Sequence, residues 1–217
     1  MRRAAIILNI NKTTVSRKIN YLAKKAYQKN TLFLKRLENN QVTHMQFDDL
    51  ITIEHTKLKP LSVTIAVDVD SETILGAEVS TIPAFGHLAE RSRDKYGHRK
   101  STHLETAKKL FLRIKDTIHP ESLVESDQHK MYPNIVKTFF SNSFHIQYKG
   151  GRAAVVGQGE LKKLEYDPLF AINHTCAMLR ANINRLVRKT WCTTKDPSML
   201  QKHLDIYMWF HNSVLKS

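Results

Sequence analysis

The stretch VTHMQFDDLITI, residues 42–53, is the first strand-like segment of this chain. Met45 and Phe47 would point to one side of an extended backbone, and Gln46 and Asp48 to the other. This period of two is typical of a β-strand with one apolar face. The strand therefore carries an acidic side chain on the face opposite Met45 and Phe47.

Two similar segments follow, LSVTIAVDV (61–69) and TILGAEVSTI (73–82). We expect EHTKLKP (54–60) to connect the first two strands and a tight turn at 70–72 to lead into the third. Three consecutive strands with short connections predict an antiparallel meander.

Helical and strand patterns alternate in the rest of the chain. The predicted segments are a basic loop at 83–101, a helix at 102–118, a short strand at 122–127, a helix at 131–140, a strand at 143–148, a glycine-containing connection at 150–159, and helices at 170–191 and 197–215. This order predicts an α/β fold in which helices flank a mixed five-stranded sheet.

The N-terminal residues predict a small helix-turn-helix. A helix at 3–8 would end at the turn Asn9-Ile10-Asn11, where asparagine tolerates left-handed backbone, and a second helix would begin near Lys12. Ile10 and Val15 would fill the angle between the helices, and a polar helical connector would follow at 27–40. The residues expected to face a DNA groove are Thr14, Ser16, Arg17 and Lys18. An ordinary helical pair packed on the main domain is the alternative.

Composition favours a polyanionic partner. The 217 residues carry a formal net charge of +14, which points to nucleic acid. No run of about eighteen apolar residues exists, so we discount a membrane. Cys176 and Cys192 are too far apart on one predicted helix to form a disulfide, and we expect a cytoplasmic, nucleoid-associated protein. The eleven histidines lack zinc-site spacing.

The strongest candidate for chemistry is a pair of aspartates. A right-handed crossover would bring the fourth strand beside the first, so Asp48 and Asp127 would approach each other. Two carboxylates 4 Å apart repel by about 4 kcal/mol at an effective dielectric constant of 20, and a divalent cation removes that cost. Hard oxygen ligands favour Mg²⁺ or Mn²⁺. Each aspartate could instead cap a local turn, and Asp68 is a competing partner for Asp48.

The segment FAINHTCAMLRANINRLVRKTW, residues 170–191, is expected to be one long basic helix. Asn173 and Arg180 are seven residues apart, so they return to nearly the same side of that helix. One face could then carry an oxygen for a metal ion and a cation for a phosphate. A solvated basic helix without any site is the alternative.

These motifs together resemble the bacterial insertion-sequence transposases of the DDE type. The resemblance is carried by QFDD at 46–49, ESDQHKMYP at 125–133 and NHTCAMLRANINRLVRKTW at 173–191, and it extends over about residues 2–213. It implies an RNase H-like catalytic domain at 41–217 and a helix-turn-helix DNA-binding segment with its connector at 1–40. The helix-turn-helix starts close to Met1, so we expect a chain shortened relative to its relatives.

The resemblance assigns the catalytic residues and marks one departure. Asp48 and Asp127 match the first two acidic residues, whereas Asn173 stands where most relatives have glutamate, with Arg180 as the basic residue after it. Some groups of such transposases use asparagine here, so an active Asp-Asp-Asn site holding two Mg²⁺ or Mn²⁺ ions is expected. Upstream carboxylates are the alternative third ligand: Glu160 and Glu165.

The implied activity is cleavage of transposon ends and strand transfer into target DNA. We expect a homodimer on double-stranded DNA, with phosphate contacts from Arg180, Arg185, Arg188 and Lys189. Two other functions stay open at this point. One is an inactive transposase remnant that only binds DNA, and the other is an RNase H-like structure-selective nuclease.

Overall fold

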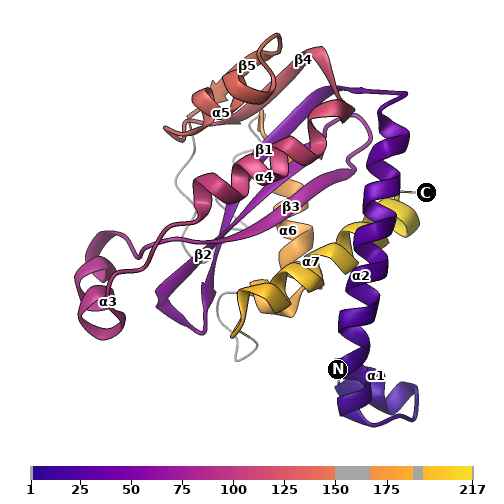
Figure 1. Ribbon diagram of the computed structural model, residues 1–217, viewed down its shortest axis with the longest axis vertical. Coiled ribbons are helices and arrows are strands. Elements are labelled where there is room, and N and C mark those ends of the chain that lie inside the picture. The colour runs from indigo at the N-terminus through magenta and orange to yellow at the C-terminus, as the bar shows by residue number, and fades with distance from the viewer. Residues whose placement is uncertain (1, 150–166, 188–192, 217) are drawn as a thin grey trace.

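A computed structural model describes residues 2–149, 167–187 and 193–216 of the chain. Its centre is a five-stranded sheet in the order β3-β2-β1-β4-β5, in which β1, β2 and β3 are antiparallel while β4 and β5 run parallel to β1. The predicted α/β fold with a mixed five-stranded sheet is confirmed (Figure 1). The strands are β1 (Val42–Glu54), β2 (Thr56–Asp68), β3 (Ile74–Thr81), β4 (Ile118–Asp127) and β5 (Phe144–Tyr148).

Helices cover both faces of this sheet and form two apolar cores. The cluster under α4 and α5 includes Met45 and Phe47, and the cluster under α6 and α7 includes Leu50. Among the described residues, no helix combines the length and the apolar composition needed to cross a bilayer. The helices are α1 (Arg2–Ile7), α2 (Lys12–Leu37), α3 (Ala89–Tyr96), α4 (His103–Ile114), α5 (Tyr132–Phe139), α6 (Phe170–Asn182) and α7 (Pro197–Phe210), with short 3-10 turns η1 (Gly86–Leu88), η2 (Lys115–Thr117) and η3 (Asn184–Leu186) and the π-helical turn η4 (His211–Leu215).

Two segments that we expected to be irregular are regular. The predicted connection at 54–60 lies inside a long β1-β2 hairpin, whose turn is made by His55 with a φ of 46°. The predicted loop at 83–101 contains α3, which ends at Gly97 with a φ of 72°. The Ser92 hydroxyl donates to the Leu58 carbonyl at 2.7 Å, so the helix and the hairpin extension hold each other.

The prediction of one long helix at 170–191 is wrong. α6 ends at Asn182, Ile183 is extended with φ −108° and ψ 96°, and η3 follows. Asparagine bonds readily to nearby backbone and a β-branched residue favours extended backbone, so this sequence is a weak helix interior. The Asn182 side chain donates to the Met178 carbonyl at 2.8 Å and so satisfies one of the last backbone acceptors of α6.

The N-terminal helices have the expected order, and the connector predicted at 27–40 is helical as far as Leu37, where it forms the end of α2. Asn9 has a φ of 48°, and the Asn11 side chain accepts from the Thr13 backbone N–H at 2.9 Å at the start of α2. α2 then continues unbroken to Leu37 and packs along α7, where Ala23 and Ala26 are buried.

The four residues that we expected to face DNA all lie in the first turns of α2. Thr14, Arg17 and Lys18 are exposed, and Ser16 is half-buried. We expected Ile10 and Val15 to fill the angle between α1 and α2. Val15 is half-buried, but Ile10 is exposed, so only part of the expected packing is present. The helix-turn-helix stays a prediction.

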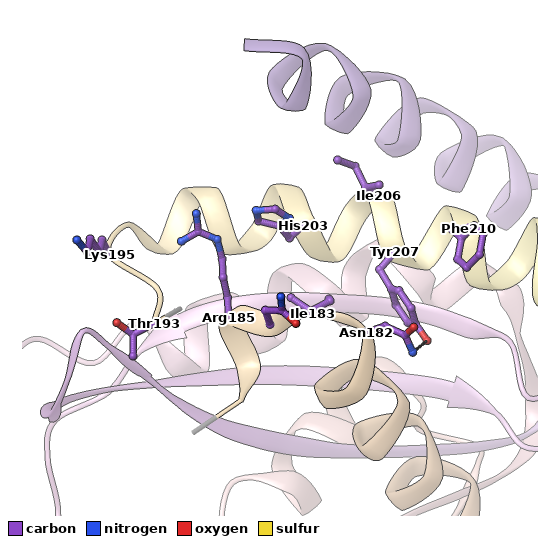
Figure 2. Close-up of a pocket in the computed structure, with 10 residues that line it drawn as sticks. Asn182, Ile183, Arg185, Thr193, Lys195, His203, Ile206, Tyr207 and Phe210 are labelled. Atoms are coloured by element: carbon purple, nitrogen blue, oxygen red, sulfur yellow. Dashed lines mark hydrogen bonds between the residues drawn. The ribbon is translucent and has the colours of Figure 1, made fainter. Parts of the chain in front are cut away.

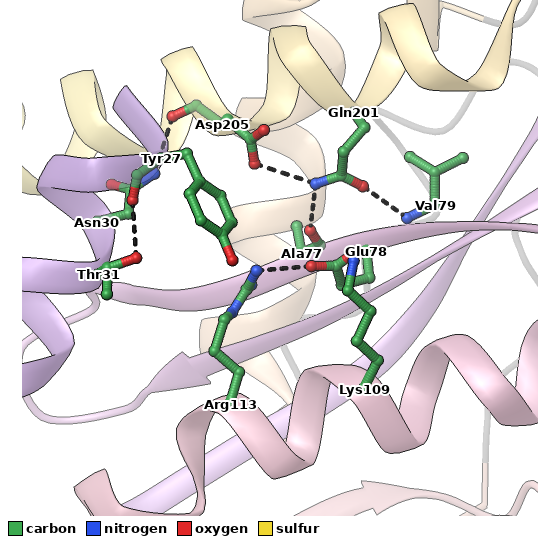
Figure 3. A network of polar contacts seen from close by, with 10 residues as sticks. All are labelled: Tyr27, Asn30, Thr31, Ala77, Glu78, Val79, Lys109, Arg113, Gln201 and Asp205. Carbon is green, nitrogen blue, oxygen red and sulfur yellow. Dashed lines mark hydrogen bonds and ion pairs between the residues drawn. The ribbon is translucent and has the colours of Figure 1, made fainter. Parts of the chain in front are cut away.

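Polar side chains from α7 complete the exposed edge of β3 (Figure 3). The Gln201 amide accepts from the Val79 N–H and donates to the Ala77 carbonyl, both at 2.9 Å, as a neighbouring strand would. The same amide donates to the Asp205 carboxyl at 3.1 Å. An edge strand covered in this way is not free to pair with another chain.

Two buried carboxyl groups in this network have different partners. Glu78 pairs with Arg113 at 2.6 Å and Lys109 at 3.1 Å, both from α4. Asp205 has no such ion pair among the described residues. Burial therefore raises the pKa of Asp205 to about 6, and the Gln201 hydrogen bond only partly opposes that effect.

We predict that Asp205→Asn stabilises the fold at neutral pH. The pKa of Asp205 is raised on folding, so its contribution to stability is fully present below pH 4 and is lost as the pH rises through 6. An uncharged amide avoids this loss, which we expect to be about 2 kcal/mol. The melting temperature of the variant should exceed that of the wild type at pH 7.5, and the difference should vanish near pH 4. A constant difference over this range contradicts the assignment.

Candidate active site

Asp48 and Asp127 lie on the neighbouring parallel strands β1 and β4. The printed register of β1 and β4 pairs His44 with Leu123 and Gln46 with Glu125. If this register continues for two more residues, it brings Asp48 opposite Asp127, which is the last residue of β4. Adjacent strands are about 4.8 Å apart, so side chains on the same face at this point are close neighbours. The two charges interact, since Asp127 raises the pKa of Asp48. A shared site at these two aspartates stays a prediction.

The surroundings of Asp48 disfavour its negative charge. Burial is the main cause that raises the pKa of Asp48 to about 7, and the negative charges of Asp127 and Asp49 add to it. The backbone N–H of Asp49 and the positive charge of Arg180 act in the opposite direction. A cation between Asp48 and Asp127 would relieve both the burial cost and the repulsion.

Asp49 points to the other face of the sheet and has a structural environment. Its carboxylate accepts from Tyr132 Oη at 2.7 Å and from Thr64 Oγ1 at 2.6 Å, and His103 Nε2 lies 2.6 Å away. Burial alone would raise the pKa of Asp49, but His103 and these hydroxyl groups outweigh burial and lower it. Asp49 therefore has its partners within the protein, whereas Asp48 faces Asp127.

The competing partner Asp68 is a turn residue. Its carboxylate accepts from the Asp70 backbone N–H at 3.2 Å and from Ser71 Oγ at 2.5 Å. It also pairs in register with Met45, three residues before Asp48 on β1. Asp68 therefore closes the turn between β2 and β3 and does not share the strand end with Asp127.

α6 brings a cation and a thiol to Asp48. Arg180 lies within electrostatic range of Asp48, and its buried Nε has no hydrogen-bond partner among the described residues. Cys176, one turn earlier, is buried beside both residues, and burial together with the charge of Asp48 raises the pKa of its thiol to about 12. The thiol stays protonated near neutral pH, so Cys176 fills space between α6 and β1 and is a poor metal ligand.

A buried glutamine fixes α6 to β1. Gln46 Nε2 donates to the Pro168 carbonyl at 2.7 Å, and Gln46 Oε1 accepts from the Ile172 backbone N–H at 3.1 Å. The same Nε2 donates to Glu125 at 2.8 Å on β4. Gln46 thus joins β1, β4 and the start of α6 two residues from Asp48. The sequence showed only that Gln46 and Asp48 share a face.

Glu125 is a second carboxylate on the same face, but it is occupied. It accepts from Gln46 at 2.8 Å and from the Tyr148 hydroxyl at 2.8 Å, and His44 Nε2 lies 2.7 Å away. Burial alone would raise the pKa of Glu125, yet these three partners lower it. Its role is to hold Gln46 and β5 in place.

Asn173 lies on the exposed side of α6 and has an acidic partner. Its Nδ2 donates to Asp167 Oδ2 at 2.9 Å, and Asp167 Oδ1 accepts from the Leu169 backbone N–H at 3.0 Å. Asp167 is an additional acidic residue just before α6 that the sequence analysis did not identify. A single aspartate before a helix is usually interpreted as a helix cap. The other predicted residues in this region, Glu160, Glu165, Arg188 and Lys189, lie outside the described residues.

The donor set suits a hard divalent cation. Asp48 and Asp127 offer carboxylate oxygens. Asn173 on α6 has a hard amide oxygen as well, and its approach to the two aspartates stays a prediction. Within the described ranges, no group of three or more histidine, cysteine or acidic side chains is arranged as a metal cluster. The two aspartates therefore define the candidate site.

No protein-family model matches this chain, and a search of curated proteins finds no match either. The functional assignment therefore rests on the residues and their geometry.

We predict that Gln46→Ala destabilises the protein by about 3 kcal/mol, because it leaves buried backbone groups of Pro168 and Ile172 without partners and opens a cavity. Gln41→Ala is the matched control, since Gln41 makes a single hydrogen bond, to the Asp116 carbonyl at 3.0 Å. Urea unfolding should show a loss of less than about 1 kcal/mol for the control. Similar losses in both variants would show that Gln46 does not hold α6.

We predict that Mg²⁺ or Mn²⁺ raises the melting temperature of the wild type and not that of Asp127→Asn. A tenfold excess of metal over its dissociation constant stabilises a folded protein by about 1.4 kcal/mol, which is about 4 °C for a chain of this size. Asp94→Asn, an exposed residue of α3, is the control and should respond as the wild type does. An equal shift in the Asp127 variant would place the metal elsewhere.

Proposed function

We propose that this chain is a DNA transposase of the DDE type that cleaves transposon-end phosphodiester bonds and joins the new 3′-hydroxyl to target DNA. The observation that supports the proposal is the electrostatic interaction of Asp48 on β1 with Asp127 of the neighbouring strand β4 and with Arg180 of α6. The strand order β3-β2-β1-β4-β5 is compatible with the RNase H-like fold that such enzymes use.

Each residue has a defined task in this reaction. Asp48, Asp127 and Asn173 would hold two Mg²⁺ or Mn²⁺ ions. When bound, these ions would activate a water or a 3′-hydroxyl and stabilise the leaving oxygen. Arg180 lies where it would contact a scissile or flanking phosphate, and Gln46 would hold α6 so that Asn173 and Arg180 stay beside β1.

DNA binding is supported by charge and exposure. The net charge of +14 favours DNA at any sequence, and phosphate contacts of this kind weaken as salt rises. The exposed residues Thr14, Arg17 and Lys18 at the start of α2 are the proposed reading surface, together with Ser16. We propose a homodimer on double-stranded DNA, with one transposon end for each copy.

The test measures cleavage and joining of duplex oligonucleotides taken from the DNA on either side of the gene. We expect the wild type to be active with Mg²⁺ or Mn²⁺ and Asp127→Asn to be about 10³-fold slower, since metal-ion catalysis contributes several kcal/mol. Asp49→Asn is a poor control because Asp49 is structural, so Asp94→Asn is used instead. Equal rates in wild type and Asp127→Asn would exclude this site.

The same assay separates the two rival functions. An inactive remnant would bind the ends in a salt-dependent manner without metal-dependent cleavage, and neither Asn173→Glu nor Asn173→Asp would restore it. A structure-selective nuclease would cut branched or hybrid substrates without preference for the end sequence. If Asp167 supplies a catalytic charge through Asn173, Asp167→Asn should slow cleavage while binding is kept.

A further inference from the structure

A cavity of about 620 Å³ lies between the end of α6, η3 and α7, apart from the aspartate site (Figure 2). Its size falls within the usual range of small-ligand sites, about 300–1,000 Å³. The residues that define its two ends are Asn182, Arg185, Lys195, His203, Tyr207 and Phe210. No step of the proposed transposition chemistry uses this cavity.

One end of the cavity is cationic. Arg185 reaches from η3 toward α7 beside His203, and Lys195 lies further toward the start of α7 (Figure 2). None of the ten described residues that line the cavity is acidic. Within the described part of the chain, neither Arg185 nor Lys195 has an ion-pair partner, and the buried Nε2 of His203 has no hydrogen-bond partner. This end is therefore suited to an anion such as a phosphate.

The other end is aromatic. Phe210 keeps 39 % of its surface exposed, and Tyr207 is buried with its hydroxyl 3.4 Å from the Asn182 amide. An exposed ring beside fixed amide and hydroxyl groups suits a planar heterocycle, which can stack on the ring and form hydrogen bonds at its edge. A simple inorganic anion would leave this half of the cavity unused.

A phosphate joined to a planar base is a nucleotide, and the geometry points to a site for one unpaired nucleotide of a single DNA strand. The inference deepens the proposed function, on which the choice of DNA as the source rests. A base inside a duplex is stacked on both faces, so it reaches Phe210 only when it is unpaired.

The test measures binding of a fluorescein-labelled twelve-nucleotide single strand by anisotropy at fixed salt. We expect Phe210→Ala to weaken binding about tenfold, which is the effect of losing one stacked base. Arg185→Gln and Lys195→Gln should each weaken binding and lower the slope of log affinity against log salt concentration by about 1. The controls are Phe144→Ala, an exposed ring of β5, and Arg36→Gln, an exposed cation of α2. Thermal melting checks that every variant is folded.

Competition identifies the ligand. Thymidine 5′-monophosphate should displace the labelled strand from the wild type, and inorganic phosphate at the same concentration should not. Equal competition by phosphate would overturn the nucleotide assignment, since it would leave an anion site alone. The single strand should also bind more tightly than the free nucleotide. If thymidine 5′-monophosphate displaces the strand at micromolar concentration and the strand binds no more tightly than the nucleotide does, the natural ligand is a free nucleotide and not DNA.

The strand-binding test of the cavity does not depend on whether the protein cleaves DNA. Asp127→Asn should lose cleavage and keep the effect of Phe210→Ala on strand binding. If the wild type does not cleave DNA but the cavity variants weaken strand binding, the proposed transposase function fails and the nucleotide site stands. If the cavity variants bind the strand as tightly as the controls do, the nucleotide site is excluded whatever the cleavage assay shows.

Discussion

The parallel pairing of β1 with β4 is the interaction on which the candidate site depends. Because the two strands run in the same direction, the register that pairs Gln46 with Glu125 would, if it continues for two residues, also bring Asp48 opposite Asp127. A shift of one residue would turn Asp48 toward the α4 core and Phe47 toward α6, at the cost of burying a charge and exposing a ring. The apolar face of β1 therefore fixes the register, and the register fixes the two carboxylates.

The second constraint is the attachment of α6 to β1. This attachment depends on polar contacts as well as on apolar packing. Gln46 uses both ends of its amide to bind backbone groups of Pro168 and Ile172. These bonds have fixed directions, so they set the rotation of α6 more closely than apolar packing can. Arg180 and Cys176 then face Asp48 as a consequence. The end of α6 at Asn182 has a further effect, since the change of direction there opens the nucleotide-sized cavity.

The sequence predicted the parts of this arrangement that follow from local periodicity. Alternation along 42–53 separates Asp48 from Asp49, and the structure gives these neighbours opposite faces and opposite pKa shifts. The role of Gln46 was not predictable, because its partners at the start of α6 are more than 120 residues away in the chain. The break at Ile183 was missed for a different reason: the apolar spacing continues through Leu186, and only the competition between asparagine side chains and the helix backbone ends α6.

In the proposed transposase, Asn173 would stand where a glutamate is usual as the third ligand, and an acidic residue holds its side chain in the structure. Asn173 commits its amide nitrogen to Asp167, which leaves the amide oxygen as the end able to meet a cation. A carboxylate that accepts from the N–H of a ligand orients that ligand and raises the negative charge on its donor atom. Asp167 can therefore return, from a short distance, part of the charge that glutamate would have brought directly. Burial and the charges of Asp127 and Asp49 raise the pKa of Asp48, and a neutral amide at position 173 adds no further negative charge to them.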